Sequence, residues 1–335
     1  MEKLKACFDF SDLPGLDLTI AGLVLSALLV FPIFPHSSYA MSTVIQFFMF
    51  ALYGMGWNTI GGYGGQVDLG LAQYLGIGAY TTAVSMIRWN TPFWVSMPIG
   101  VVIAIGWCFV VGYSVFRLKG HYFAIATIAM SLVLKDIFEV WKFVGASRGL
   151  EIPSTRFTSP DFLHLVFTND IYYYYLILAF FVIGFLYINW FRKSRLGFQL
   201  RSIKDNDEVA RSLGINVQWA KLKTYAVAVT FVSAVGSFHT CYVKNIEPED
   251  TMSLDISILI ALMAMLGGAG SLWGPIIGAG ILIPLKSYLK EWLGARAGLV
   301  GIDVVIYGAI IMFISAVEPR GVWGIVQRVR RRKRA

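Results

Sequence analysis

The sequence predicts an all-α, polytopic integral membrane protein of about ten transmembrane helices, interrupted by glycine-rich broken-helix segments. Its 335 residues are 57% hydrophobic and only 14% charged, whereas soluble domains carry about 25% charged residues. The mean hydropathy is +0.65. Crossing a bilayer takes roughly 20 apolar residues in a helix. Uncharged runs of at least that length follow one another along the chain: 18–67, 89–116, 171–191, 224–243 and 256–285.

The orientation of the predicted spans follows from the basic residues, because cytoplasmic loops carry an excess of lysine and arginine. With a cytoplasmic N-terminus, 19 basic residues lie on the inner side and 7 on the outer side. Both termini are therefore expected on the cytoplasmic side of a bacterial-type inner membrane. The ten predicted spans are 18–35, 40–60, 70–87, 93–116, 122–142, 171–191, 222–243, 255–273, 275–290 and 300–317.

The predicted layout is one transmembrane domain, 18–317, between a cytoplasmic N-terminal segment, 1–17, and a basic cytoplasmic tail, 318–335. The extracytoplasmic loop 143–170 and the cytoplasmic loop 192–221 are the longest connections. The net charge is +8. On a membrane protein, basic clusters beside the bilayer favour anionic lipid. Lipid is therefore a better partner for the tail than nucleic acid.

A glycine-rich stretch, GGYGGQVDLGLAQYLGIGAY, separates the second span from the third. Glycine is a poor helix former and tolerates positive φ, so the chain is expected to unwind here. Broken helices at membrane depth line substrate routes in many transporters; the alternative is close helix packing at small residues. A second break is predicted within 266–280. The predicted pathway residues are Gly62, Gly64, Gly65, Gln66, Asp68, Gly267, Gly268 and Gly270.

The cytoplasmic loop contains KDNDEVARSLGINV, which begins at Lys204. Asp205 and Glu208 have capping-box spacing, and Gly214 suits a left-handed helix stop. The pattern predicts a helix of about two turns, with Val209 and Leu213 one turn apart on one face. Such a short helix needs a surface to pack on. Its own subunit or the membrane could supply that surface, and so could a cytoplasmic partner for which the helix is a docking element.

Several enzyme signatures are missing from the sequence. No Gly-Lys dipeptide occurs, which excludes a phosphate-binding GxxxxGK[ST] loop, and neither HExxH nor CxxC is present. The four histidines, His36, His121, His164 and His239, have no partner at metal-ligand spacing. We therefore expect no catalytic residue, no metal site and no cofactor in this chain.

The cytoplasmic loop resembles the EAA-type coupling loop of ABC importer permeases at Glu208, Ala210 and Gly214, with Val209 in place of the middle alanine. From about residue 40 to 324, further segments resemble, in order, the M-type subunit of the branched-chain amino acid ABC transporter permeases. They are Gly62-Tyr-Gly-Gly-Gln66, Leu69-Gly70, Gly76-Ile-Gly-Ala-Tyr80, Gly120-His-Tyr-Phe-Ala-Ile-Ala-Thr127, Gly149-Leu150 with Ile152-Pro153, Leu266-Gly-Gly-Ala-Gly-Ser-Leu-Trp-Gly-Pro275 and Pro319-Arg-Gly321.

This resemblance implies a permease that imports branched-chain or related amino acids. Its implied partners are a homologous permease subunit, two cytoplasmic ATPases that bind ATP-Mg, and an extracytoplasmic solute-binding protein. The family commonly has serine where Asp68 stands and often histidine where Leu71 stands. Urea, short amides and aromatic acids therefore remain alternative solutes. The implied coupling residues are Asp205, Asn206, Glu208, Ala210, Leu213 and Gly214.

A second hypothesis is an ion-coupled secondary transporter, in which Asp68, Asp136 or Glu139 would bind a proton or cation. Charges inside a span are costly and mark function or a structural pair. Lys135 and Glu139 are one helical turn apart and can pair with each other. An intramembrane enzyme is a weaker third hypothesis, because no nucleophile and base are recognisable.

Overall fold

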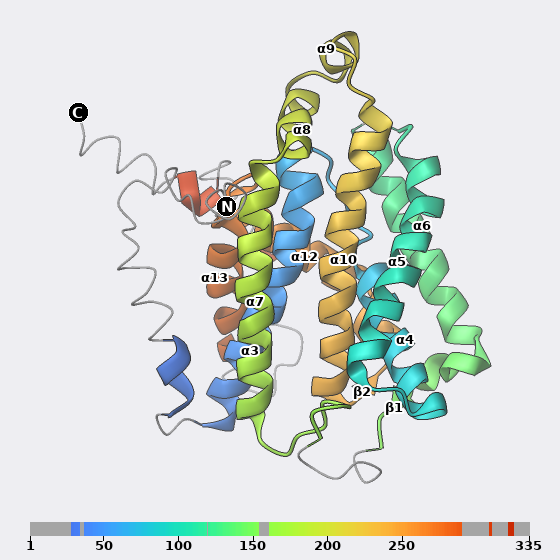
Figure 1. Ribbon diagram of the computed structural model, residues 1–335, viewed down its shortest axis with the longest axis vertical. Coiled ribbons are helices and arrows are strands. Elements are labelled where there is room, and N and C mark those ends of the chain that lie inside the picture. The colour runs from blue at the N-terminus through green and yellow to red at the C-terminus, as the bar shows by residue number, and fades with distance from the viewer. Residues whose placement is uncertain are drawn as a thin grey trace.

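The protein is a bundle of long helices with most chain reversals at its two ends (Figure 1). The computed structural model describes residues 28–33, 37–118, 120–153, 161–289, 308–309 and 321–324. Its principal helices are α3 (Ser38–Asn58), α4 (Ala72–Trp89), α5 (Phe93–Val115), α6 (His121–Val140), α7 (Asp170–Arg192), α10 (Val217–Val243), α12 (Leu254–Gly268) and α13 (Gly274–Leu289).

Each of these eight helices coincides with one predicted span, from 40–60 through 275–290. Most of the predicted spans 18–35 and 300–317, the whole segment 1–17 and most of the tail lie outside the described residues. Among the described residues, five helical segments are long and apolar enough to cross a membrane, and α13 is a shorter apolar helix. The predicted all-α, polytopic membrane fold is confirmed.

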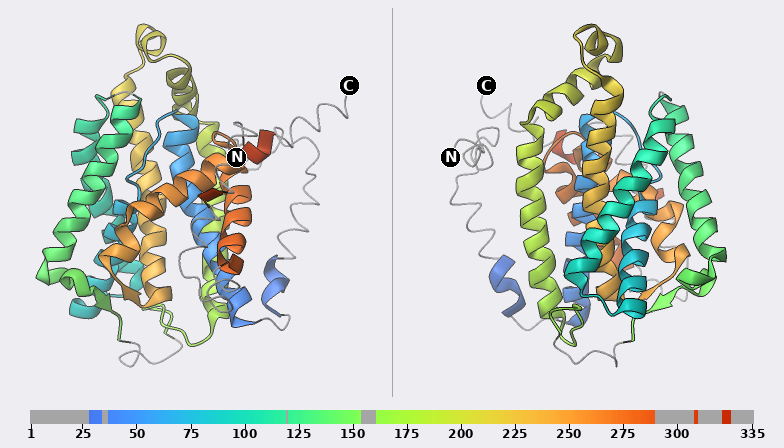
Figure 2. Two further views of the ribbon diagram at one scale, coloured as in Figure 1. Left: turned by 180° about the vertical axis from the view of Figure 1, so that it is seen from behind. Right: turned by 45° about the vertical axis from the view of Figure 1, so that its right-hand side comes forward.

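Helix α10 lies at the centre of the bundle and packs against α3, α4 and α5, while α3 also contacts α7, α12 and α13. Helices α4 and α10 approach so closely that a side chain at Gly236 would collide with the backbone carbonyl of Leu75. Small residues permit such approach in membrane bundles. Helix α6 stands at the edge of the molecule beside α5 (Figure 2).

At one end of the bundle, the cytoplasmic loop of the prediction forms two helices, α8 (Arg195–Asp205) and α9 (Asp207–Ser212). We call this end the coupling-loop end. The predicted capping residue was wrong by one position, because Asp205 continues α8. Asn206 adopts an extended conformation instead, and its Oδ1 accepts from the amides of Glu208, at 2.9 Å, and Val209, at 3.2 Å. The predicted helix therefore corresponds to α9, and α8 precedes it as a helix that the sequence did not predict.

Helix α9 is six residues long, close to the length of about two turns that the sequence predicted. Its stop at Gly214 has the predicted left-handed geometry, with a φ of 81°. Ala210 is buried in a small apolar cluster with Ile203, Val217 and Ala220. Val209 and Leu213 point outward and are 53% and 72% exposed. The helix therefore presents an apolar face that the described part of the chain leaves exposed.

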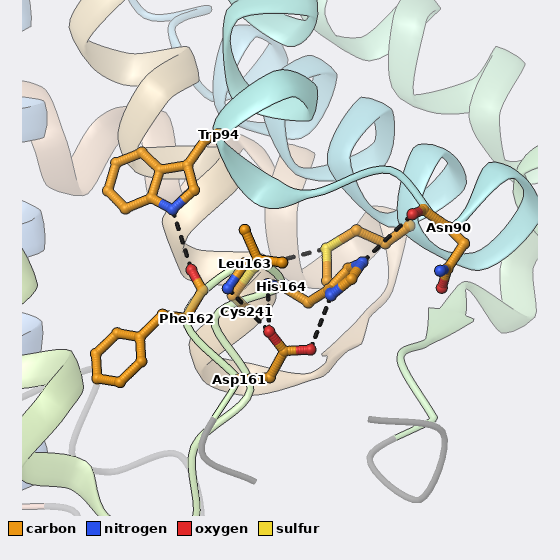
Figure 3. Close-up of polar contacts among 8 residues, drawn as sticks. Asn90, Trp94, Asp161, Phe162, Leu163, His164 and Cys241 are labelled. Carbon is orange, nitrogen blue, oxygen red and sulfur yellow. Dashed lines mark hydrogen bonds and ion pairs between the residues drawn. The ribbon is translucent and has the colours of Figure 1, made fainter. Parts of the chain in front are cut away.

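The opposite end of the bundle holds a two-stranded antiparallel sheet of β1 (Leu150–Glu151) and β2 (Asn245–Ile246). Beside it lies the segment 161–167, which we call the Asp161 loop (Figure 3). The Asp161 carboxylate is 2.8 Å from His164 Nδ1 and accepts from the amides of Leu163 and His164. His164 Nε2 is 3.3 Å from the Asn90 carbonyl oxygen. The contact with Asn90 ties the loop to the C-terminal end of α4.

Candidate functional site

The first predicted break is present and follows α3 directly. The helix widens into a π-helical turn, η2 (Thr59–Tyr63), and then ends. Residues 65–70 run without helical structure to α4, and Gly65 has a φ of 70°. Wide turns of this kind occur often at functional sites. The run of poor helix formers therefore unwinds the chain where the sequence predicted.

The second break is also present, between α12, which ends at Gly268, and α13, which begins at Gly274. Gly268 and Gly270 have φ values of 121° and 85°, which a residue with a side chain rarely adopts. Gly321, from the segment Pro319-Arg-Gly321, packs on this break: a Cβ atom there would lie 2.7 Å from the amide nitrogen of Gly268. The two distant motifs therefore meet at the second break.

The two breaks contact each other through Asn58, the last residue of α3. Its Nδ2 donates to the Ser271 carbonyl oxygen at 2.8 Å, and its Oδ1 accepts from the Gly270 amide at 2.8 Å. A Cβ atom on Gly62 would lie 2.5 Å from the Gly270 amide nitrogen, so only glycine fits there. We call residues 58–65 together with 267–271 the glycine junction.

The glycine junction is also tied to the coupling-loop end. Lys204 of α8 donates from Nζ to the Gly62 carbonyl oxygen at 2.8 Å. The Leu200 side chain of the same helix is fully buried and approaches Gly64. Because a π-helical turn frees a backbone carbonyl, the lysine supplies a donor that the helix lacks. The coupling loop and both breaks thus form one connected unit.

Gln66 and Asp68 lie beyond the junction and are both buried, with Asp68 fully so. Asp68 Oδ1 accepts from the Gly70 amide at 2.8 Å, and its backbone carbonyl accepts from Trp57 Nε1 at 2.7 Å. The carboxyl faces Thr127 of α6 and Tyr225 of α10. In this conformation the carboxyl has no exposed surface, so contact with a solute would require the surrounding helices to separate.

The structure brings together Gly62, Gly267, Gly268 and Gly270, whereas Gly64 and Gly65 contact α8. Sequence reasoning missed Asn58 and Lys204. Asn58 is a polar residue inside an apolar span, and such residues are candidates for function by that fact alone. Lys204 carries no comparable signal, because a lysine in a polar loop is usually solvated.

The charged group of α6 is a structural pair with a partner that the sequence did not indicate. Lys135 Nζ is 3.5 Å from Glu139 Oε1, one turn along the helix, as predicted. It also bonds Glu249 of α11 (Pro248–Met252). This cluster links two helices near the β1–β2 end, away from the glycine junction.

The sequence contains one GxSxG motif that was missed, and the structure shows that its setting differs from that of a catalytic serine. Residues Gly145-Ala-Ser-Arg-Gly149 match the GxSxG spacing that hydrolases place on a sharp turn between a strand and a helix. Here the segment forms two short 3-10 turns, η3 (Lys142–Val144) and η4 (Ala146–Arg148), after α6. The Ser147 hydroxyl donates to the Glu139 carbonyl oxygen at 3.0 Å. The strand–turn–helix context of a nucleophile is absent from this described segment.

The chain is similar to known membrane permeases. The family model of the branched-chain amino acid transport system permease component matches residues 39–315. The chain is 24% identical over 264 residues to the high-affinity branched-chain amino acid transport system permease protein LivM of Escherichia coli (strain K12), which covers 73% of this chain and 62% of that protein. The chain therefore spans less than two thirds of the length of that relative.

Two archaeal relatives, both from Methanocaldococcus jannaschii, are also similar. The probable branched-chain amino acid transport permease protein LivM is 24% identical over 284 residues, which is 77% of this chain and 80% of that protein. The probable permease protein LivH of that organism is 24% identical over 211 residues, which is 60% and 63%. No solved structure matches the chain. With the family model matched across most of its helices, the chain is a multi-pass membrane protein that belongs to the permease components of branched-chain amino acid transport systems.

Proposed function

We propose that this chain is the permease subunit of an ABC importer that translocates branched-chain or related amino acids across the inner membrane. The observation that carries the proposal is the bond from Lys204 to Gly62. It connects a helix pair with an uncovered apolar face to two broken helices. In a permease of this family, such a connection would let a movement of the docking helix α9 change the conformation of the broken helices that line the solute route. The permease itself performs no covalent chemistry.

The proposed assembly contains a homologous permease subunit, two ATPases that bind ATP-Mg, and an extracytoplasmic solute-binding protein. The relatives include permeases named LivM and a permease named LivH, which supports an assembly with two different permease subunits. The exposed face of Val209 and Leu213 suits docking of an ATPase, since a helix can bind a partner by laying its apolar face into a hydrophobic groove. In this assembly both chain termini lie in the cytoplasm.

We place the solute route at the glycine junction, with Asp68 and Gln66 beside it. An aspartate there would favour solutes that carry an ammonium group or several hydrogen-bond donors. The solute panel in any assay therefore includes urea, short amides and aromatic acids besides branched-chain amino acids. The closed packing around Asp68 supports a route that opens only during the transport cycle.

The proposal is tested by purifying the chain with its genetic neighbours and measuring ATP-driven uptake in proteoliposomes. Leu213→Asp should lower uptake and ATPase retention about tenfold or more, as expected when an interface anchor is lost. Ser212→Asp adds the same charge at the neighbouring exposed position and should have little effect. Uptake by this chain alone, driven by an ion gradient and independent of ATP, would establish the secondary-transporter hypothesis instead.

A further inference from the structure

Two hollows lie side by side where α5 and α10 pack together. The first has a volume of about 530 Å³ and is almost entirely apolar. Its walls come from both helices and include Phe109, Val110, Tyr113, Trp219 and Leu222. Tyr113 and Trp219 are 63% and 54% exposed. On a membrane protein this hollow opens toward lipid.

The second hollow continues the first toward the coupling-loop end and shares Phe116 and Gln218 with it. Its volume is about 350 Å³, and its lining is mainly polar. Arg117, which follows α5, and Arg211, which lies on α9, both face it together with Asn216. No acidic side chain lines this hollow, so its charge is positive.

The two arginines are available for an anion. Within the part of the chain that the structure describes, neither forms an ion pair with a carboxylate, and Asp207 of α9 pairs with Lys221 at 3.2 Å instead. The Arg117 guanidinium stacks 4.8 Å from the Tyr113 ring centroid. Because Tyr113 lines the apolar hollow and Arg117 the polar one, this contact joins the two.

We propose that the two hollows together bind one anionic phospholipid. Its phosphate would lie between Arg117 and Arg211, where a guanidinium can donate two parallel hydrogen bonds to phosphate oxygens. One acyl chain would extend along Tyr113, Val110 and Trp219. Basic pockets between membrane helices favour anionic headgroups, and a free anion would leave the adjoining apolar hollow unfilled. The charge and the continuity of the two hollows therefore identify a lipid.

This site lies outside the glycine junction and does not depend on the proposed transport function. It has a consequence for the coupling-loop end, because Arg211 and the exposed Leu213 belong to the same short helical segment. A lipid bound to Arg211 would hold α9 against the membrane surface. The lipid composition of the membrane would then influence the position of that helix.

The experiment uses the purified full chain, exchanged into nanodiscs of phosphatidylcholine or of phosphatidylglycerol with identical acyl chains. Lipid that remains bound after extraction is measured by native mass spectrometry. The parent should retain phosphatidylglycerol in preference to phosphatidylcholine. Each Arg→Gln change should weaken retention roughly fivefold, and the Arg117→Gln, Arg211→Gln double variant about thirtyfold. The exposed Arg195→Gln, at the start of α8 and outside both hollows, should retain lipid like the parent.

A second pair of measurements distinguishes a lipid from a soluble anion. Val110→Trp fills the apolar hollow without touching the arginines and should lower phosphatidylglycerol retention, while an excess of inorganic phosphate should not displace the lipid. The double Arg→Lys variant keeps both charges and checks that loss in the Gln variant is not a folding defect. Equal retention of both lipids by the parent, or no effect of Val110→Trp, would overturn the proposal.

Discussion

The two ends of the bundle hold irregular backbone together in different ways. At the glycine junction, backbone meets backbone: Gly62 lies against Gly270, and Asn58 and Lys204 bond to main-chain groups. At the Asp161 loop, side chains fill the space between segments. There the Trp94 indole donates to the Phe162 carbonyl oxygen at 3.0 Å, and Asp161 bonds His164 (Figure 3).

The difference has a physical consequence for movement. Side chains packed against one another resist displacement, because a close-packed interior tolerates few alternative arrangements. Glycine backbone held by a few hydrogen bonds can change conformation at lower cost, since glycine populates most of φ/ψ space. We infer that the glycine junction is built to rearrange and that the Asp161 loop is built to stay fixed. The following predictions test that contrast.

The largest effect is expected for Gly62→Ala. The new methyl group would collide with Asn58 and approach the Gly270 amide nitrogen to 2.5 Å. The Gly270 amide is held in this conformation by its hydrogen bond to Asn58 and cannot relieve the clash without losing that bond, so the loss of stability should reach about 3 kcal/mol. Gly106→Ala is the control, because nothing lies within 4 Å of its Cβ position. Thermal unfolding in detergent compares the two, and equal melting temperatures would contradict the close contact.

Asn58→Ala should have the next largest effect. It removes both hydrogen bonds to the second break and leaves the Gly270 amide and the Ser271 carbonyl without their partner. A buried polar group left unsatisfied costs about 1–3 kcal/mol. Asn245→Ala, an exposed change at the opposite end, should stay within about 0.5 kcal/mol. Thermal unfolding and uptake are measured for both variants. Parent-like values for Asn58→Ala would show that Asn58 does not hold the two breaks together.

The contrast also explains how much of this structure the sequence could predict. Glycine runs and long uncharged runs are local features of the sequence, so both breaks and eight spans could be located from it. The contact between Asn58 and Gly270 joins positions 212 residues apart, and no spacing rule encodes such a pair. The cap of α9 was misplaced because Asp205, Asn206 and Asp207 are all acceptable capping residues. Only the backbone conformation of Asn206 decides between them.

The Asp161 loop was not predicted at all. Asp161 and His164 are three residues apart in a segment with no helical or strand pattern, and the turn that brings them together is specified by their own hydrogen bonds. The role of Lys204 was not predicted for a related reason. Its partner is the Gly62 carbonyl, which becomes available only because the helix is widened there. Contacts that depend on irregular backbone therefore lie beyond sequence patterns.

A smaller effect on stability, but a distinct one on function, is expected for Lys204→Met. The change removes one hydrogen bond to a backbone carbonyl, worth about 0.5–1.5 kcal/mol, and keeps the apolar stem that packs near Gly65. In the assembled importer, uptake per ATP hydrolysed should fall several-fold while ATP hydrolysis continues. Lys204→Arg should restore part of the ratio, and Lys223→Met, an exposed lysine of α10, should leave it unchanged. If Lys204→Met keeps the parent's ratio of uptake to ATP hydrolysed, the bond between the coupling loop and the glycine junction does not contribute to coupling.

The smallest effect is expected at the Asp161 loop and depends on pH. Burial alone would raise the pKa of Asp161, but hydrogen bonds from His164 and from the amides of His164 and Leu163 outweigh it and lower the pKa below its ordinary value. A carboxyl with a lowered pKa stabilises the fold fully above its unfolded value of about 3.9, and that contribution is lost as the pH falls through the lowered pKa. Asp161→Asn should therefore melt at a lower temperature than the parent at neutral pH, and the difference should shrink as the pH drops below about 4. The exposed Glu151→Gln on β1 serves as the control and should melt like the parent at neutral pH. A difference between parent and Asp161→Asn that is the same at every pH would show that the loop is held by packing rather than by this carboxylate.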